Sequence, residues 1–314
     1  MSNITTEGGV RAERKPDVWT RMKKYRSLYW LMLPGILYFL IFSYGPMYGI
    51  TIAFKDYWMN MGILKSPWIG LDNFRRLLAA PKFYEVFSNT LIISLEKIVC
   101  GFPVPIILAL LLNEIYSTKL KRVLQTVMYL PHFISWVVIS GIIFILFSQN
   151  GPVNNLLEAM HIGKVNFLTN PSTFRPMIIV SDIWKECGWG TIIYLASITG
   201  ISPEYYEAAM IDGASRFQQI TKITLPCILP TVVVMLVLRV GGITNAGFDQ
   251  IFNLYNEAVY KTGDIIQTYN YRIGLADGDY SMGTAVGLLL NIINCALMLA
   301  TNYISNKLTG MGLY

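Results

Sequence analysis

Charged residues are scarce in this chain of 314 residues, because they account for 14% of it while hydrophobic residues account for 54%. A soluble globular domain is about 25% charged, so the composition argues against an ordinary water-soluble protein and favours one that lies in a lipid bilayer. The formal net charge is +6, but no basic patch is interleaved with aromatic residues. We therefore attribute the charge to membrane topology, and no nucleic-acid partner is expected.

Cysteine and histidine are few, and a nucleotide-binding motif is absent. The four cysteines, Cys100, Cys187, Cys227 and Cys295, form no C-x-x-C pair, so we expect free thiols packed as small hydrophobic side chains. The two histidines, His132 and His161, have no cysteine or carboxylate partner at ligand spacing, so no metal site is predicted. No G-x-x-x-x-G-K-[ST] loop occurs, so the chain is not expected to hydrolyse ATP or to bind a cofactor itself.

Long hydrophobic stretches dominate what is present. Since about 20 apolar residues cross the hydrocarbon core of a bilayer, we expect six spans, at residues 28–54, 86–113, 123–147, 176–200, 227–248 and 282–305. The sequence thus predicts an all-α, polytopic membrane protein with an N-terminal tail at 1–27 and a transmembrane domain at 28–314. The first stretch has a basic flank like that of a signal peptide, but it is too long and no small-residue cleavage site follows it, so we expect it to be retained.

Positive charges predict the orientation, because lysine and arginine collect on the cytoplasmic side of a membrane. They precede the first stretch and crowd the connection after the second, at Arg11, Arg14, Lys15, Arg21, Lys23, Lys24, Arg26, Lys119, Lys121 and Arg122. The N-terminus and segment 201–226 are therefore expected in the cytoplasm, and segments 55–85, 149–175 and 249–281 outside. The first outer segment weakens this rule with cations of its own, at Lys55, Lys65, Arg75, Arg76 and Lys82.

One block between the fourth and fifth stretches stands out. It contains Glu207-Ala208-Ala209 and Asp212-Gly213-Ala214, and it ends at Ile223-Thr224-Leu225-Pro226. We expect a short amphipathic helix beginning near Pro203, a sharp turn at the glycine, and a second short helix ending at Leu225-Pro226. Such an element is a rigid knob.

The spacing of this block, E-A-A, three residues, Gly, nine residues and I-x-L-P, resembles the cytoplasmic coupling loop of the permease subunits of binding-protein-dependent ABC importers. Further segments resemble the carbohydrate-uptake group of these permeases: Ser181 to Glu186, Gly188 to Gly190, Gly247 to Phe252, and Tyr280-Ser281. The stretches Leu33-Pro34-Gly35, Pro46 to Gly49 and Ala53 to Asp56 resemble the subset associated with oligosaccharide and polysaccharide-fragment uptake in Gram-positive bacteria.

The resemblance implies a type I ABC importer fold, a place in the plasma membrane of a bacterium, with a Gram-positive source favoured, and several partners. These are a second permease, which is expected to be non-identical, two nucleotide-binding subunits that carry ATP and magnesium, and an extracellular solute-binding lipoprotein. The loop at 201–226 would receive the force of ATP hydrolysis. Its expected contact residues are Glu207 for a charged contact, Gly213 for the turn, Ala208, Ala209 and Ala214 for close packing, and Asp212.

Polar side chains inside the apolar stretches predict where the solute passes. A buried polar group that faces lipid costs several kcal/mol, on the order of a lost hydrogen bond in hydrocarbon, and one set of six helices offers too few polar faces to enclose a path. We therefore expect this chain to form half of an oligosaccharide pathway. The expected lining residues are Asn89, Glu96, Asp182, Glu186, Trp189, Tyr194, Asn245 and Asn291.

Plainer alternatives remain for these residues and for the whole chain. The charged residues could form structural pairs between helices, and the aromatic residues could be interfacial anchors. Arg239 lies in the middle of the fifth stretch, and we expect it to pair with a carboxylate rather than with an acidic sugar. The solute could instead be an amino acid or a peptide, and an ion-coupled secondary transporter would use Glu96 and Asp182 as ion sites without needing the coupling block.

Overall fold

The structure is a computed structural model that describes residues 23–309. The described residues are almost entirely helical, as expected for an all-α protein, apart from turns and one isolated bridge between Lys55 and Trp68. The chain divides into two compact units, Met1–Thr51 and Ile52–Tyr314. Most of the basic residues that were expected in the cytoplasmic tail, from Arg11 to Arg21, lie outside the described residues.

The described part of the first unit is a helical run that continues to Phe54. α2 spans Arg26–Phe39, the π-helix η1 spans Leu40–Tyr44, and the 3₁₀-helix η2 spans Gly45–Phe54. The hydrogen-bond ladder changes near Pro46, which has no N–H to donate to the preceding turn. The run Arg26–Phe54 is long and apolar enough to cross a membrane, in agreement with the first predicted stretch.

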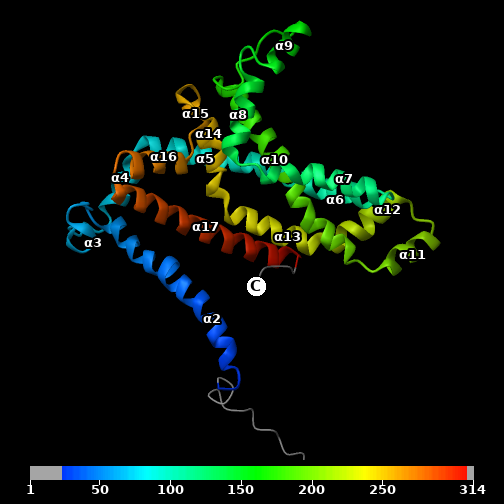
Figure 1. The fold of residues 1–314 in the computed structure, drawn as a ribbon, viewed down its shortest axis with the longest axis horizontal. Helices are drawn as coiled ribbons and strands as arrows, with labels where there is room; N and C mark the ends of the chain where they lie inside the picture. Colours follow the sequence, from blue (N-terminus) through cyan, green and yellow to red (C-terminus); the bar gives the residue numbers. More distant parts are fainter. Residues whose placement is uncertain (1–22, 310–314) are drawn as a thin grey trace, which may run out of the picture. The chain divides into compact units, whose positions relative to one another are not determined.

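The second unit contains the remaining helices (Figure 1). Its first half holds α3 (Gly62–Lys65), α4 (Asp72–Ala79), α5 (Pro81–Gly101), α6 (Pro103–Asn113), α7 (Thr118–Tyr129), η3 (Leu130–Phe133), α8 (Trp136–Phe147) and α9 (Pro152–Ala159). Its second half holds α10 (Pro171–Thr199), α11 (Pro203–Ile211), α12 (Arg216–Gln219), η4 (Ile220–Thr224), α13 (Leu225–Gly241), η5 (Ile243–Asn245), α14 (Phe248–Leu254), η6 (Glu257–Val259), α15 (Tyr260–Gly263), α16 (Ile266–Tyr271), η7 (Arg272–Ala276) and α17 (Tyr280–Thr309).

The predicted count of six spans is not confirmed. Among the described residues, 5 runs are long and apolar enough to cross a membrane, namely Arg26–Phe54, Pro81–Asn113, Trp136–Ala159, Arg216–Gly241 and Tyr280–Lys307. α10 has sufficient length, with 29 residues, but Asp182, Lys185 and Glu186 give its centre more charge than a lipid-facing helix carries. It forms the centre of the second unit instead, because it packs against α5, α6, α7, α13 and α14.

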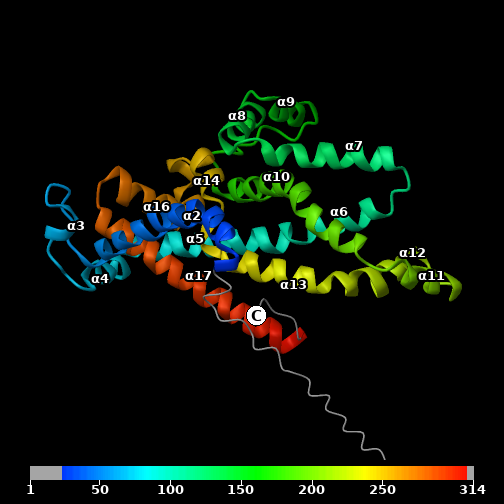
Figure 2. The same ribbon diagram turned by 60° about the horizontal axis from the view of Figure 1, so that its bottom comes forward.

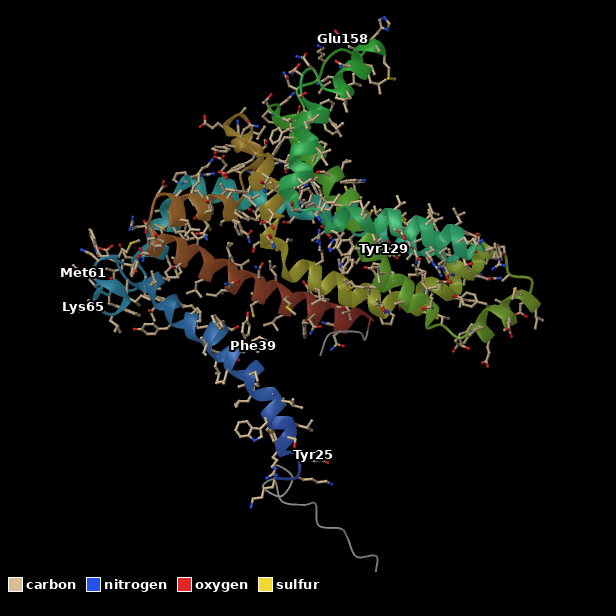
Figure 3. All side chains as sticks on the ribbon, in the orientation of Figure 1. Tyr25, Phe39, Met61, Lys65, Tyr129 and Glu158 are labelled. Atoms are coloured by element: carbon tan, nitrogen blue, oxygen red, sulfur yellow. The ribbon has the colours of Figure 1, made fainter. Side chains whose placement is uncertain are left out.

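The prediction of a single helix over 123–147 is wrong. α7 ends at Tyr129 (Figure 3), a 3₁₀ turn follows around Pro131, and Ile134 and Ser135 are extended. Pro131 cannot continue a helical ladder because it has no N–H. Ser135 then starts a new helix, since its Oγ accepts a hydrogen bond from the Val138 N–H at 3.4 Å. α8 therefore departs from the direction of α7 and projects from the side of the unit with α9 beyond it (Figures 1 and 2).

Two of the segments that were expected to share one side of the membrane, 55–85 and 249–281, lie together. The Tyr57 N–H donates to Ser281 Oγ at 2.9 Å, and the Arg76 guanidinium lies 3.8 Å from the Asp279 carboxylate. α11 and α12 lie at the opposite end of the second unit (Figures 1 and 2). The predicted topology requires this separation, while the side that faces the cytoplasm stays a prediction.

Asp264 organises the segment between α14 and α17. Its side chain is fully buried, and its oxygens accept hydrogen bonds from Arg272 at 2.6 and 3.1 Å and from Thr268 Oγ1 at 2.7 Å. Burial lowers the pKa of the Arg272 guanidinium, but the hydrogen bonds and charge of Asp264 outweigh this effect, so the pKa is raised. Arg272 therefore remains charged at every pH at which the protein is folded.

The four cysteines are free thiols, as predicted. Their predicted packing is wrong for three of them, because Cys100, Cys227 and Cys295 are exposed on the surface of the chain. Each lies on a helix that is long enough to cross a membrane, where a small, weakly polar thiol can face either lipid or another helix.

Candidate functional site

The block at 201–226 forms two short helices joined by a tight turn. α11 starts at Pro203, where the missing N–H is harmless in the first turn. Gly213 follows the helix with φ = +77°, a left-handed conformation that glycine adopts without steric cost. The Gly213 N–H donates to the Met210 carbonyl at 3.1 Å, and the Ala214 N–H donates to the Ala209 carbonyl at 2.8 Å. The turn therefore lies where the sequence places it.

The second short helix does not end at Leu225-Pro226, as the sequence predicted. α12 starts with a capping box, in which the Ser215 and Gln218 side chains each bond the backbone of the other residue. It then passes through the π-turn η4 directly into α13, with Pro226 in the first turn of α13. A proline cannot donate to the carbonyl four residues earlier, and the wider π-turn accommodates this loss.

The tip of this block carries apolar side chains that no residue in the described part of the chain covers. Ile211 is 87% exposed and Phe217 is 74% exposed. Tyr205 and Met210 are also exposed, and so are the predicted contact residues Glu207, Ala208, Asp212 and Gly213, whereas Ala209 and Ala214 are partly buried. An exposed apolar patch rimmed by polar residues is typical of a protein-binding surface.

Two contacts stabilise the block internally, and a third fixes it to the rest of the second unit. Tyr206 Oη lies 2.9 Å from Thr224 Oγ1, which joins α11 to η4. Gln219, which is buried, donates to the Ala214 carbonyl at 3.1 Å and supports the turn from below. Arg216 donates to Tyr116 Oη at 2.6 Å and lies over its ring, so α12 also contacts the connection between α6 and α7.

A network of charged and polar side chains lies at the centre of the helices. Lys97 of α5 is 3% exposed, and its Nζ donates to Asp182 Oδ1 at 2.9 Å and to Gln250 Oε1 at 2.5 Å. Gln250 of α14 is fully buried and donates to the Ile178 carbonyl and to Ser181 Oγ of α10. Arg239 of α13 lies 3.6 Å from Asp182 Oδ2. The predicted pairing of Arg239 with a carboxylate is thus confirmed.

The turn after α13 leaves room for this network. Gly247 has φ = +85°, and a Cβ placed on it would lie 2.5 Å from Lys97 Nζ, so any larger residue would collide with the ammonium group. A cavity of about 250 Å³ opens beside it, lined by residues of α5, α10, α13 and the 242–247 turn, including Ser94, Lys97, Asp182, Arg239 and Asn245. Asn245 is therefore at a cavity, as predicted for a residue of the pathway, and it also accepts from the Phe248 N–H at 3.4 Å.

A second polar cluster lies at the break between α7 and α8. His132 Nδ1 is 2.9 Å from Glu186 Oε2, and its ring stacks on Trp189 with a centroid separation of 4.5 Å. Lys185 donates to the His132 carbonyl at 2.6 Å and lies 3.7 Å from Glu186. These contacts give Glu186 and Trp189 structural partners within the chain, while both remain accessible at its surface.

A larger cavity of about 530 Å³ lies between α16, η7 and α17. Amide, hydroxyl and aromatic side chains line it, among them Asn270, Asn291, Asn294, Tyr271, Tyr280 and Phe248. Gly274 and Gly283 approach so closely that a Cβ on either would lie within 3.1 Å of the Cα of the other, which leaves the backbone itself as part of the wall. Sequence reasoning placed Asn291 in the pathway but did not connect it with Asn270 and Asn294, because no spacing rule connects α16 with α17.

Three other predicted pathway residues have different surroundings. Asn89 is buried and uses its amide to accept from Arg175 at 2.8 Å and to donate to the carbonyls of Lys261 and Asp264. Tyr194 is 2% exposed in an apolar cluster with Ile198 and Ile228. Glu96 is partly buried, and its Oε2 has no hydrogen-bond partner among the described residues. The Asn89 amide is thus bonded within the chain, and the Tyr194 ring lies inside an apolar cluster.

Comparison with known proteins agrees with this geometry. Residues 101–310 match the family model of the "binding-protein-dependent transport system inner membrane component". The chain is 43% identical to protein LplB of Bacillus subtilis over 294 residues, which cover 93% of this chain and 92% of LplB. It is 41% identical to the polygalacturonan/rhamnogalacturonan transport system permease protein YteP of the same organism, over 97% of this chain and 95% of YteP.

Two solved structures are similar to this chain over almost its whole length. A chain in the crystal structure of a bacterial ABC transporter involved in the import of the acidic polysaccharide alginate superimposes with a TM-score of 0.87, at 44% identity, over 93% of this chain and 99% of that chain. A chain of the bacterial alginate ABC transporter, in complex with its periplasmic protein bound to alginate pentasaccharide, gives the same TM-score at 43% identity. The family match covers most of the chain, so this protein belongs to the inner-membrane components of binding-protein-dependent transport systems, the permease subunits of ABC importers.

Proposed function

We propose that this chain forms half of the translocation pathway of an ATP-driven oligosaccharide importer and couples to separate ATPase subunits through residues 201–226. The observation that carries the proposal is the exposed apolar tip of α11 and α12, held rigid at the end of the second unit that lies farthest from the 249–281 segment.

The coupling role follows from the physical character of the tip. Burying Ile211 and Phe217 in a cleft of an ATPase subunit would contribute about 1.5–3 kcal/mol for each side chain. Glu207, exposed on α11, would add a charged contact at the rim, and the small side chains of Ala208, Ala209 and Ala214 would allow close approach. ATP and magnesium would be held by the ATPase subunits, and this chain would transmit the motion without catalysis.

The sugar assignment is supported by the cavity between α16 and α17. Neutral hydroxyl groups need planar donors and acceptors together with aromatic surfaces, and the cavity offers the amides of Asn270 and Asn291 beside Tyr271 and Tyr280, whereas the Asn294 amide bonds Thr244. The relatives and solved structures that resemble the chain include importers named for polysaccharides. We infer that the chain takes up an oligosaccharide in the plasma membrane of a bacterium, with its N-terminus in the cytoplasm.

The remaining partners follow from the same proposal. A second permease, most often a different chain in this family, would supply the other half of the pathway, and an extracellular solute-binding lipoprotein would deliver the sugar. Closure of two ATPase subunits would then expose the cavities outward, and hydrolysis would reset them. In this proposal Asn245, Asn291 and the surface of Trp189 would line the path, since each is accessible at the surface or at a cavity.

The test is transport by the purified complex in proteoliposomes. Gly213→Pro cannot adopt φ = +77°, because proline is held near −65°, and Glu207→Ala removes the charged contact. We expect both variants to insert normally but to lose substrate-stimulated ATPase activity and uptake. Glu204→Ala, in the first turn of the same helix, is the matched control and should transport normally. Full uptake with either of the first two variants would refute the coupling assignment.

A further inference from the structure

The cavity of about 250 Å³ beside Asp182 carries more positive than negative charge. Its charged lining consists of two cations, Lys97 and Arg239, and one carboxylate, Asp182. The volume corresponds to about eight water molecules at roughly 30 Å³ each, so the space exceeds what a single bridging water requires. A polar cavity of this size has room for a group of a solute.

The two cations differ in how many close hydrogen-bond partners they have. Lys97 is 3% exposed, and its ammonium is bonded to Asp182 and to Gln250 at hydrogen-bond distance. Arg239 has a side chain that is 49% exposed, and its nearest carboxylate oxygen is 3.6 Å away, beyond the range of a good hydrogen bond. Among the described residues Arg239 makes no other ion pair, so most of its five N–H donors are available.

The carboxylate cannot neutralise both cations fully. Asp182 Oδ1 is taken up by Lys97 at 2.9 Å, which leaves Oδ2 for a looser contact with Arg239. An excess positive charge within the helices of a membrane protein is costly unless an anion compensates for it. A guanidinium is well suited to such an anion, because its planar fork binds a carboxylate through two parallel hydrogen bonds.

We propose that this cavity binds the carboxylate of an acidic sugar unit and that Arg239 is the residue that recognises it. The inference rests on the proposed role in oligosaccharide uptake and specifies the class of sugar as a uronate-containing chain. Asp182, itself fixed by the hydrogen bond from Lys97, is an incomplete partner that holds the guanidinium in place. Asn245, exposed at the same cavity, supplies an amide for a neighbouring hydroxyl group.

The test measures protection of a cysteine in the cavity in the assembled complex, without the solute-binding protein. Asn245→Cys, in a chain whose four native cysteines are replaced, is labelled with a small polar maleimide in the presence of trigalacturonate or its fully methyl-esterified form. We expect trigalacturonate to protect at a concentration at least about tenfold lower than the ester, because a charge-assisted bidentate contact is lost in the ester. Leu238→Cys, at the same cavity, is a second reporter if the first disturbs folding.

Variants of Arg239 then separate recognition from structure. Arg239→Gln should reduce the acid-to-ester preference to about one, and Arg239→Lys should retain part of it because lysine keeps the charge but loses the fork. Equal protection by both sugars in the unmodified background, or a preference that survives Arg239→Gln, would overturn the inference. So would loss of assembly with Arg239→Gln, because it would assign the guanidinium to a partner chain. ATP-driven uptake by the complete complex tests the proposed function separately, since uptake of a neutral sugar would leave it intact.

Discussion

The shared carboxylate of Asp182 predicts an asymmetry between two substitutions that each break the same ion pair. Asp182→Asn leaves the Lys97 ammonium, 3% exposed, with only the Gln250 amide as a close partner, and leaves Arg239 without a carboxylate. Lys97→Met removes the buried ammonium but leaves Asp182 with Arg239 at 3.6 Å. The first change therefore leaves an uncompensated buried cation, and the second does not leave an uncompensated anion.

The magnitudes follow from the burial of each group. Removing one partner of a buried pair typically costs about 3–5 kcal/mol, and we expect Asp182→Asn to reach this range. For Lys97→Met, Asp182 keeps Arg239 as a counter-ion, screened by solvent because its side chain is 49% exposed, so the carboxylate is not left as a lone buried charge. We therefore expect Lys97→Met to cost about 1–2 kcal/mol, as a core substitution of similar volume does.

Thermal unfolding of the detergent-solubilised complex, followed by size-exclusion chromatography after heating, measures the difference. Since about 1 kcal/mol shifts the unfolding midpoint of a large domain by about 2–4 °C, the midpoint should fall by about 6–20 °C with Asp182→Asn and by about 2–8 °C with Lys97→Met. Lys164→Met is the matched control, because the pair of Lys164 with Glu158 is at the surface. Equal midpoints for the Asp182 and Lys97 variants would refute the reasoning that one carboxylate serves both cations.

Three further predictions concern other parts of the chain. Arg272→Gln should destabilise the protein by about 3–5 kcal/mol, because Asp264 is fully buried, whereas Arg76→Gln, at an exposed pair, should cost no more than about 1 kcal/mol; equal unfolding midpoints would contradict this. Gly188→Ala should prevent assembly of the helices, since its Cβ would lie 1.9 Å from the Met128 carbonyl oxygen, while Gly141→Ala, with no atom within 4 Å, should be tolerated; normal membrane levels of both variants would show that α7 can move away. The purified chain alone should show no ATPase activity and should co-purify with two ATPase subunits and another permease, and mass photometry of the complex would expose any other composition.

The sequence carries the coupling block almost completely, because all of its determinants are local. The left-handed conformation at position 213 favours a glycine there, and Pro203 marks the start of α11. The sequence misplaces the end of the block, because Pro226 suggests the end of a helix. The structure places it in the first turn of α13, where a missing N–H does no harm once a π-turn precedes it.

The central network could be predicted only in part, since it depends on contacts between distant segments. Arg239 indicated that a carboxylate must lie nearby, but hydropathy could not show that Asp182 serves Lys97 as well. Gln250, fully buried beside them, gave no signal of its own because one glutamine in a polar turn is unremarkable. The break at Pro131 was missed for a related reason, since length and composition over 123–147 suit a single span and only the cap formed by Ser135 reveals two helices.

The hydrogen bond from Arg216 to Tyr116 has a mechanical consequence. In the proposed coupling, a force on the 201–226 block would reach the helices along the chain, through η4 into α13, and also across this contact into the connection between α6 and α7. The two routes act as springs in parallel, so their stiffnesses add and the stiffer one carries more of the load. Loss of the Tyr116 hydroxyl would leave the 201–226 block attached to α13 but less rigidly held. Part of each movement would then bend the block instead of moving the transmembrane helices.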